Sequence, residues 1–115
     1  GDIMAAGAFT KSLGERTPKL LSQHDTDDVI GVIDVIHETS EGLYFEGRLP
    51  KENSLVKDLV PLIKIGAIDS CSIGFNTVVS EWNNDTNIRT LKEVDLWEIS
   101  IVTFPVLKIL SIRLS

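Results

Sequence analysis

The apolar residues of this chain fall mainly in short runs that are rich in Val and Ile and alternate with polar positions. Alternation with a period of two is the side-chain pattern of a β-strand, and β-branched residues favour that conformation. Residues 53–65 are the only long segment with apolar side chains at helical spacing. We therefore predict a mainly β fold: a small bent sheet or β-barrel of about six to seven mostly antiparallel strands with one principal helix.

Turn and cap residues divide these elements. Thr26-Asp27-Asp28 predicts an acidic turn, because such side chains bond back to their own backbone. The next strand, Val29 to His37, has apolar residues on both faces, which indicates a strand covered on both sides. A hairpin loop of about four or five residues should follow it. Asn53 or Ser54 can cap the helix, and Pro61 predicts a kink within it. The strands are expected over residues 19–23, 29–37, 43–49, 68–81, 88–104 and 107–114, with a short helical turn over 8–13.

Length, charge and cysteine content narrow the class of protein. With 115 residues, 43% of them hydrophobic and 24% charged, the chain is expected to be one globular domain. A net charge of −6 with scattered basic residues argues against nucleic acid as a partner. No apolar run approaches the roughly 20 residues that cross a bilayer, so no membrane partner is expected. A single cysteine excludes an internal disulfide and fits a reducing cytoplasm.

The stretch from Ser70 to Phe75 combines two hydroxyls and the only thiol in a strand-like run. Alternation places Ile68, Ser70, Ser72 and Gly74 on one face and Cys71, Ile73 and Phe75 on the other. The second face is a core face, so Cys71, although a rival nucleophile, is expected to be a buried small hydrophobe. On the first face, Ser72 beside Gly74 is expected to be the most accessible hydroxyl. The alternative is a half-buried strand whose serines simply face water.

Glu98 is the carboxylate that most needs an explanation. It lies in a strand-like run, residues 96–102, whose two faces are both largely apolar. A partly buried carboxylate without a partner costs several kcal/mol, so Glu98 should have a partner, a chemical role or both. The structural alternative is an ion pair with Arg48 or Arg89. Asp95, three residues earlier, falls on the opposite face and is expected to be exposed.

Two histidines are available, His24 before an acidic run and His37 at the end of a strand. The run after His24 matches no calcium loop, and no second histidine stands at helical spacing for zinc, so we expect no metal site and no cofactor. His37, beside Glu38, is expected to be solvated. A serine, a histidine and a carboxylate are what nucleophilic acyl transfer requires, because the imidazole takes the hydroxyl proton and the acid orients the imidazole.

An ordered set of motifs resembles the prohead (capsid maturation) proteases of tailed phages. The set is Gly7-Ala8-Phe9, Ser12-Leu13, His24-Asp25, Gly31, Gly42-Leu43, Gly66, Ser72-Ile73-Gly74-Phe75 and the block from Leu96 to Pro105. The match spans nearly the whole chain. That family is distantly similar to the herpesvirus assemblins, serine proteases built on a small β-barrel ringed by helices, so a herpesvirus-protease-like fold is implied.

The resemblance implies catalytic roles for particular residues. Ser72 becomes the nucleophile and His24 the general base of a serine endopeptidase. Glu98 ranks first as the third member, ahead of Asp95 and then of His37, which precedes the serine whereas assemblins place their second histidine after it.

Candidates for the oxyanion site are the backbone N–H groups of Ile73 and Gly74. The implied substrate is the scaffold or capsid-protein precursor, and also the protease itself, inside an immature capsid in the host cytoplasm. The alternative function is a non-catalytic, protease-like domain that binds scaffold or portal during assembly.

Two departures from the family pattern lead to further expectations. The family has a first strand upstream of the segment that begins at Gly1, so residues 1–115 are expected to be a single protease domain without that strand. An open sheet edge would favour self-association, and we expect a dimer or higher homo-oligomer. After Pro105 the family carries small residues, whereas this chain has larger apolar ones.

Overall fold

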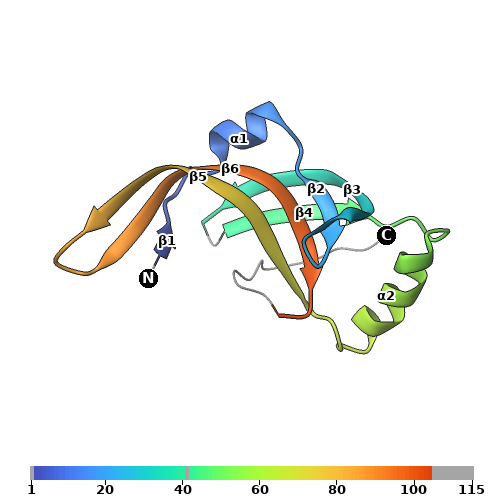
Figure 1. Cartoon of the computed structure of the whole chain (residues 1–115). Helices are drawn as coiled ribbons and strands as arrows, with labels where there is room; N and C mark the ends of the chain where they lie inside the picture. The colour runs from blue at the N-terminus through green and yellow to red at the C-terminus, as the bar shows by residue number, and fades with distance from the viewer. Residues whose placement is uncertain (1, 41, 105–115) are drawn as a thin grey trace.

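A mainly β architecture is present in the computed structural model, which describes residues 2–40 and 42–104 (Figure 1). The elements in chain order are β1 (Asp2–Met4), α1 (Thr10–Glu15), β2 (Lys19–Ser22), β3 (Asp25–Thr39), β4 (Gly42–Arg48), α2 (Ser54–Lys64), β5 (Ser70–Asn83) and β6 (Ile88–Val102). The predicted fold class is therefore confirmed. The strand expected over 107–114 lies outside the described residues.

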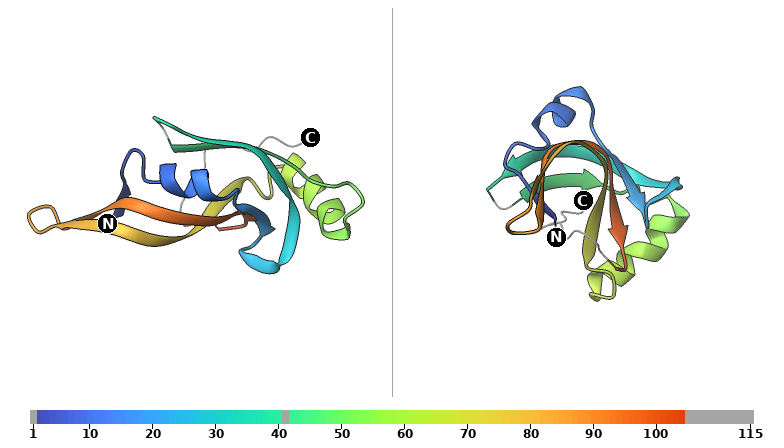
Figure 2. Two further views of the ribbon diagram at one scale, coloured as in Figure 1. Left: turned by 90° about the horizontal axis from the view of Figure 1, so that it is seen from above. Right: turned by 60° about the vertical axis from the view of Figure 1, so that its left-hand side comes forward.

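Strand β6 is the centre of the sheet. One of its edges pairs with β5 in an antiparallel ladder, and the other pairs with β1 and β2 in parallel. The antiparallel pairs β2–β3 and β3–β4 complete the sheet. The sheet curls into half of a barrel, and the β5–β6 hairpin projects from it as a two-stranded arm (Figure 2). Most strand pairs are antiparallel, as predicted, but β6 also forms two parallel pairs.

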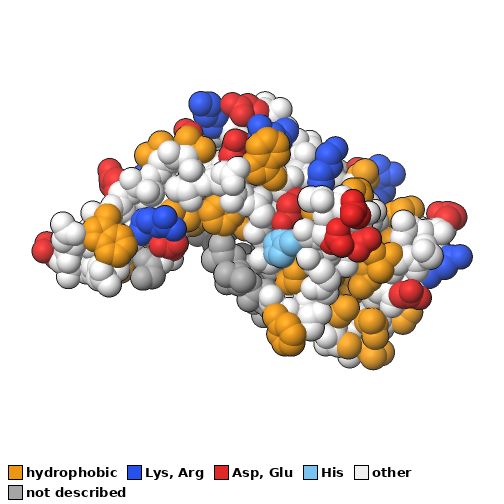
Figure 3. Space-filling model, in the orientation of Figure 1, with side chains coloured by type: hydrophobic (Ala, Val, Ile, Leu, Met, Phe, Trp, Pro, Cys, Tyr) orange, Lys and Arg blue, Asp and Glu red, His pale blue; other side chains and the backbone are white. Residues whose placement is uncertain are grey.

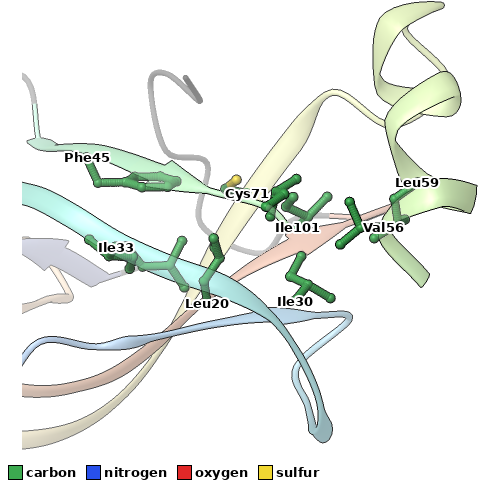
Figure 4. Packing of buried hydrophobic residues seen from close by; sticks show 10 residues of the cluster. Leu20, Ile30, Ile33, Phe45, Val56, Leu59, Cys71 and Ile101 are labelled. Carbon is green, nitrogen blue, oxygen red and sulfur yellow. The ribbon is translucent and has the colours of Figure 1, made fainter. Parts of the chain in front are cut away.

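The main core lies inside this curl. Side chains from β2, β3, β4, β5 and β6 point toward one another there, and α2 closes one end (Figure 4). The buried members are Leu20, Ile30, Ile33, Phe45, Leu49, Val56, Leu59, Cys71, Ile99 and Ile101. The core thus holds the part of the β5–β6 ladder that carries Ser72 against the rest of the domain.

Strand β3 differs from its prediction in two ways. It begins at Asp25, so the acidic run is strand and the chain reverses one step earlier, at residues 23–24. It is also covered on one side only, because Val29, Val32 and Val35 are 51%, 50% and 41% exposed. Register shifts in both of its ladders change which residues face inward, and a strict two-residue alternation misses such shifts.

Helix α2 is one continuous helix, although Pro61 lies inside it. The Asn53 side chain accepts a hydrogen bond from Val56 N at 3.1 Å, as the predicted cap requires. Pro61 removes only one N–H donor and lies in the last turn of the helix, so the expected kink does not divide it. The loop between β3 and β4 is shorter than expected, since Thr39 already pairs with Gly42. Neither of the two helices described is long and apolar enough to span a membrane.

Candidate active site

His24 occupies a two-residue turn between β2 and β3. Ser22 pairs with Asp25 across the ladder, so Gln23 and His24 form the whole reversal. Their φ angles are 53° and 58°, as the type I′ hairpin turn requires at both central positions. Asn-Gly is the common sequence for such a turn, and side chains other than glycine cost free energy there. The turn therefore aims the His24 side chain at the expense of some backbone strain.

Four hydrogen bonds tie this turn to the end of β6. Gln23 N donates to Ile101 O at 2.9 Å, and His24 N donates to Ser100 Oγ at 2.9 Å. The Gln23 amide group also pairs with Thr103, donating from Nε2 to Oγ1 at 3.0 Å and accepting from Thr103 N at 3.3 Å. The histidine is thus fixed against the strand that carries Glu98.

The Glu98 carboxylate bridges the histidine and a buried serine. Its Oε1 contacts His24 Nδ1, and its Oε2 accepts a hydrogen bond from Ser100 Oγ at 2.6 Å. The Glu98 side chain is 13% exposed, whereas the His24 side chain is 40% exposed. The space-filling view shows a histidine at the surface beside acidic side chains (Figure 3). One carboxylate oxygen therefore faces the imidazole, while the other accepts the hydrogen bond from Ser100.

Neither arginine considered as a partner for Glu98 contacts it. Arg48 pairs with Asp34 and Arg89 pairs with Asp2, each with a shortest distance of 2.7 Å. Both carboxylates have a pKa lowered by the hydrogen bond from their arginine. The charge of Glu98 is satisfied instead by the histidine and the Ser100 hydroxyl.

Ser72 lies one strand away from this group, on the same face. It pairs directly with Ser100, and Gly74 pairs directly with Glu98, without a register shift between them. Directly opposed residues in an antiparallel ladder point to the same side. Gly74 verifies this, because a Cβ added to it would lie 2.2 Å from Glu98 Oε1. Ser72, Ser100, Glu98 and His24 thus meet on one side of the β5–β6 ladder.

Ser72 is less accessible than the sequence suggested. It is 2% exposed and Ser70 is 5% exposed, so the expectation of an accessible hydroxyl is wrong. Alternation predicts which way a side chain points but not what covers it. On the neighbouring strand, for example, the β2–β3 turn packs over Ser100. Among the described residues, no hydrogen bond joins the Ser72 hydroxyl to His24.

Cys71 points into the core, away from Ser72. It is fully buried among the apolar residues of the main core. Burial raises the pKa of its thiol to about 12, so almost none of it is thiolate near neutral pH. Its surroundings are those of the small hydrophobe that the alternation predicted.

The lower-ranked candidates for the acid lie elsewhere. Asp95 Oδ1 accepts from Arg16 Nη1 at 2.7 Å, and that guanidinium stacks 4.0 Å from the Trp97 ring centroid. His37 is exposed on the β3–β4 hairpin, where its ring centroid lies 5.0 Å from that of Tyr44. Neither is joined to His24 by a hydrogen bond within the described part of the chain.

Ser100 is a contributor to the site that the sequence analysis did not predict. It is fully buried and contacts both His24 and Glu98. The sequence does contain an indication of this role, because Ser100 stands two residues after Glu98 and therefore lies on the same strand face. The two residues with candidate oxyanion N–H groups, Ile73 and Gly74, follow Ser72 in the ladder opposite Ile99 and Glu98. In residues 2–40 and 42–104, no group of three or more metal-binding side chains is assembled.

Comparison with known proteins gives a consistent family. The family model described as caudovirus prohead serine protease matches residues 1–115. The prohead protease of Enterobacteria phage HK97 is 32% identical over 109 residues, covering 91% of this chain and 48% of that protein. The prohead protease of Escherichia phage T5 is 30% identical over 109 residues, covering 91% of this chain and 51% of that protein. The chain thus spans about half the length of these relatives. No solved structure matches it significantly.

Proposed function

Because the chain belongs to the caudovirus prohead serine protease family, we propose that it is a serine endopeptidase that uses Ser72, His24 and Glu98. Ser72 is the nucleophile, His24 is the general base, and Glu98 orients the imidazole. The contact between Glu98 Oε1 and His24 Nδ1, on the face that also carries Ser72, is the observation that supports this assignment.

The contact determines which ring nitrogen can act as the base. A carboxylate accepts hydrogen bonds, so Nδ1 carries the proton that faces Glu98. In the neutral ring the lone pair then resides on Nε2, the atom that must take the proton from Ser72. Catalytic hydrogen bonds are often long without substrate and shorten when it binds, so the absence of a bond from Ser72 to His24 is compatible with this role.

The reaction then follows the acyl-transfer route. Ser72 Oγ attacks the carbonyl carbon of the scissile peptide while its proton passes to His24 Nε2. Of the two candidate donors, the backbone N–H groups of Ile73 and Gly74, only one can point at the tetrahedral oxyanion, because successive N–H groups of a strand point to opposite edges. Collapse breaks the C–N bond, and the imidazolium gives its proton to the leaving amine. Water, activated by the same imidazole, then hydrolyses the acyl-enzyme.

The proposed substrate is the scaffold or capsid-protein precursor, together with the protease itself. The setting is the interior of the immature capsid in the host cytoplasm. Within it, residues 1–115 act as a single protease domain that works as a dimer or higher homo-oligomer. These points rest on membership of the family, and each is open to test with purified proheads.

Labelling with a fluorophosphonate tests the proposal, since only an activated serine reacts with this reagent. The protein, alone and co-assembled with scaffold, is labelled and the modified peptide is identified by mass spectrometry. Label on Ser72, lost in both Ser72→Ala and His24→Ala but kept in Cys71→Ala, is the expected result. Scaffold cleavage should be lost in the same two variants. Continued cleavage by Ser72→Ala would overturn the assignment.

A second function, a non-catalytic domain that binds scaffold or portal, is favoured by one observation. Ser72 is 2% exposed and is not hydrogen-bonded to His24 among the described residues. On this alternative, no label is incorporated even in the presence of scaffold, and Ser72→Ala leaves scaffold binding and capsid maturation unchanged. The same labelling experiment therefore separates the two functions.

A further inference from the structure

We propose that Ser100 is a positioning residue that holds Glu98 and the His24 turn in one fixed arrangement. Its importance for catalysis rests on the proposed function, whereas its effect on the His24 side chain does not. Ser100 is fully buried in β6, and its hydroxyl is hydrogen-bonded to Glu98 and to the His24 backbone.

The Ser100 hydroxyl makes two hydrogen bonds with opposite polarity. It donates its single proton to Glu98 Oε2 at 2.6 Å and accepts from His24 N at 2.9 Å. A serine hydroxyl has one proton to donate and lone pairs to accept, so both bonds form at once. One oxygen atom therefore ties the acid to the backbone of the histidine that the acid orients.

This arrangement restricts a side chain that is otherwise free to turn. Glutamate has three rotatable side-chain bonds, and a carboxylate held at one oxygen presents the other in a fixed direction. With Oε2 bound to Ser100, Oε1 faces His24 Nδ1. Because Ser100 also pairs directly with Ser72 in the ladder, the distance between His24 and Ser72 also depends on Ser100.

Replacing Ser100 with alanine should therefore loosen the histidine without removing any catalytic residue. The Glu98 carboxylate loses a charge-assisted bond, and the His24 N–H loses its acceptor. A hydrogen bond to a charged group corresponds to a rate change of about 10- to 100-fold. We expect a loss of that size in kcat with little change in KM, because the Ser100 hydroxyl is already bonded to Glu98 and to the His24 backbone.

Ser12 provides a matched control. It is 2% exposed, and its hydroxyl accepts from the N–H of Leu96 on β6 at 2.8 Å. Both serines are thus buried acceptors of a backbone N–H, but Ser12 lies outside the candidate site. Ser12→Ala should reduce stability by a similar amount without affecting the histidine.

The experiment records imidazole ¹H–¹⁵N spectra and cleavage kinetics of the full chain and its variants. In the wild type, the His24 Nδ1–H bound to Glu98 should give a downfield proton signal, and exposed His37 serves as the internal reference. We expect Ser100→Ala to lose this signal and about 10- to 100-fold in kcat, and Ser12→Ala to keep both. Ser100→Thr, which retains the hydroxyl, should restore the signal. Ser100→Cys, nearly the same size but a weak donor, should lose it while remaining folded.

The outcomes separate the two proposals. An unchanged His24 signal in both Ser100→Ala and Ser100→Cys would overturn the positioning role, whatever the activity. Loss of the signal in Ser100→Ala, with no fluorophosphonate label on any form of the protein, would support the positioning role and refute the peptidase. Equal effects of Ser12→Ala and Ser100→Ala on the His24 signal would also overturn the positioning role, since a general loss of stability would then explain both effects.

Discussion

Gly74→Ala should separate catalysis from folding. A Cβ at this position would lie 2.2 Å from Glu98 Oε1, 2.7 Å from Cδ and 2.9 Å from Cγ. All three contacts are to one side chain and none is to the backbone. The ladder can therefore keep its register, but the Glu98 carboxylate must leave its place between His24 and Ser100.

The effect on stability should be small because its two main contributions oppose each other. Alanine in place of glycine within a strand is favourable by about 0.5–1 kcal/mol. Loss of the Ser100 hydrogen bond to the charged Glu98 costs about 1.5–3 kcal/mol. Glu98 is partly exposed and can turn toward water, so no buried charge is left unpaired. The net loss in the free energy of unfolding is about 0.5–2.5 kcal/mol, which leaves a typical domain almost entirely folded.

The effect on cleavage should be large. Without its carboxylate partner the imidazole loses its fixed tautomer and orientation, which in serine proteases costs about 10⁴-fold in kcat. Urea unfolding and the rate of fluorophosphonate labelling measure the two effects on the same preparations. Gly14→Ala is the matched control, since a Cβ there meets nothing within 4 Å. A folded Gly74→Ala protein that labels at the wild-type rate would refute the assignment of Glu98.

Three other substitutions test separate parts of the structure. Glu98→Gln keeps the shape of the side chain but offers His24 an amide, and should lower kcat about 10⁴-fold while Ser72→Ala abolishes labelling. Near-wild-type cleavage by Glu98→Gln would exclude its role. The Cys71 pKa of about 12 lies above its ordinary value of 9.0, so the neutral thiol stabilises the fold fully below pH 9 and loses this effect as the pH rises toward 12. The unfolding free energy of the wild type should therefore fall faster than that of Cys71→Ala over this range, by up to about 1.4 kcal/mol per pH unit, and parallel curves would contradict this. Gly31→Ala would place a Cβ 2.1 Å from the backbone oxygen of Arg48, and urea unfolding should show a loss of roughly 3 kcal/mol or more.

The sequence predicted those features that depend on local pattern. Strand-like runs identified β2 to β6 but not β1, the alternation around Cys71 identified its core face, and Asn53 is one of the two cap residues predicted. The apolar setting of Glu98 also indicated correctly that this carboxylate needs a partner. Each of these inferences uses only neighbours along the chain, and short-range preference is what a single sequence records directly.

Features that depend on long-range pairing were not predictable in the same way. The acidic run does contain the expected local bond, from Asp27 N to Asp25 Oδ1 at 2.9 Å, but it lies within β3 and not in a turn. Such a local hydrogen bond can therefore form within a paired strand. For this reason the acidic run alone does not show at which residues the chain reverses. Likewise, the partners of Glu98 follow from the β2–β6 and β5–β6 registers.

The backbone at residues 23–24 gives an independent reason to assign His24 a role. A two-residue hairpin turn with positive φ at both positions is most stable with Asn-Gly, and residues with side chains at such angles cost of order 1 kcal/mol or more each. The turn is held by hydrogen bonds from Gln23 and His24 to Ile101, Ser100 and Thr103. The backbone N–H bonds would form with Asn-Gly as well, so folding alone does not require a histidine. What the histidine adds is an imidazole held against Glu98 beside the strand of Ser72, and a strained position occupied by a chemically active side chain is the pattern of a functional site.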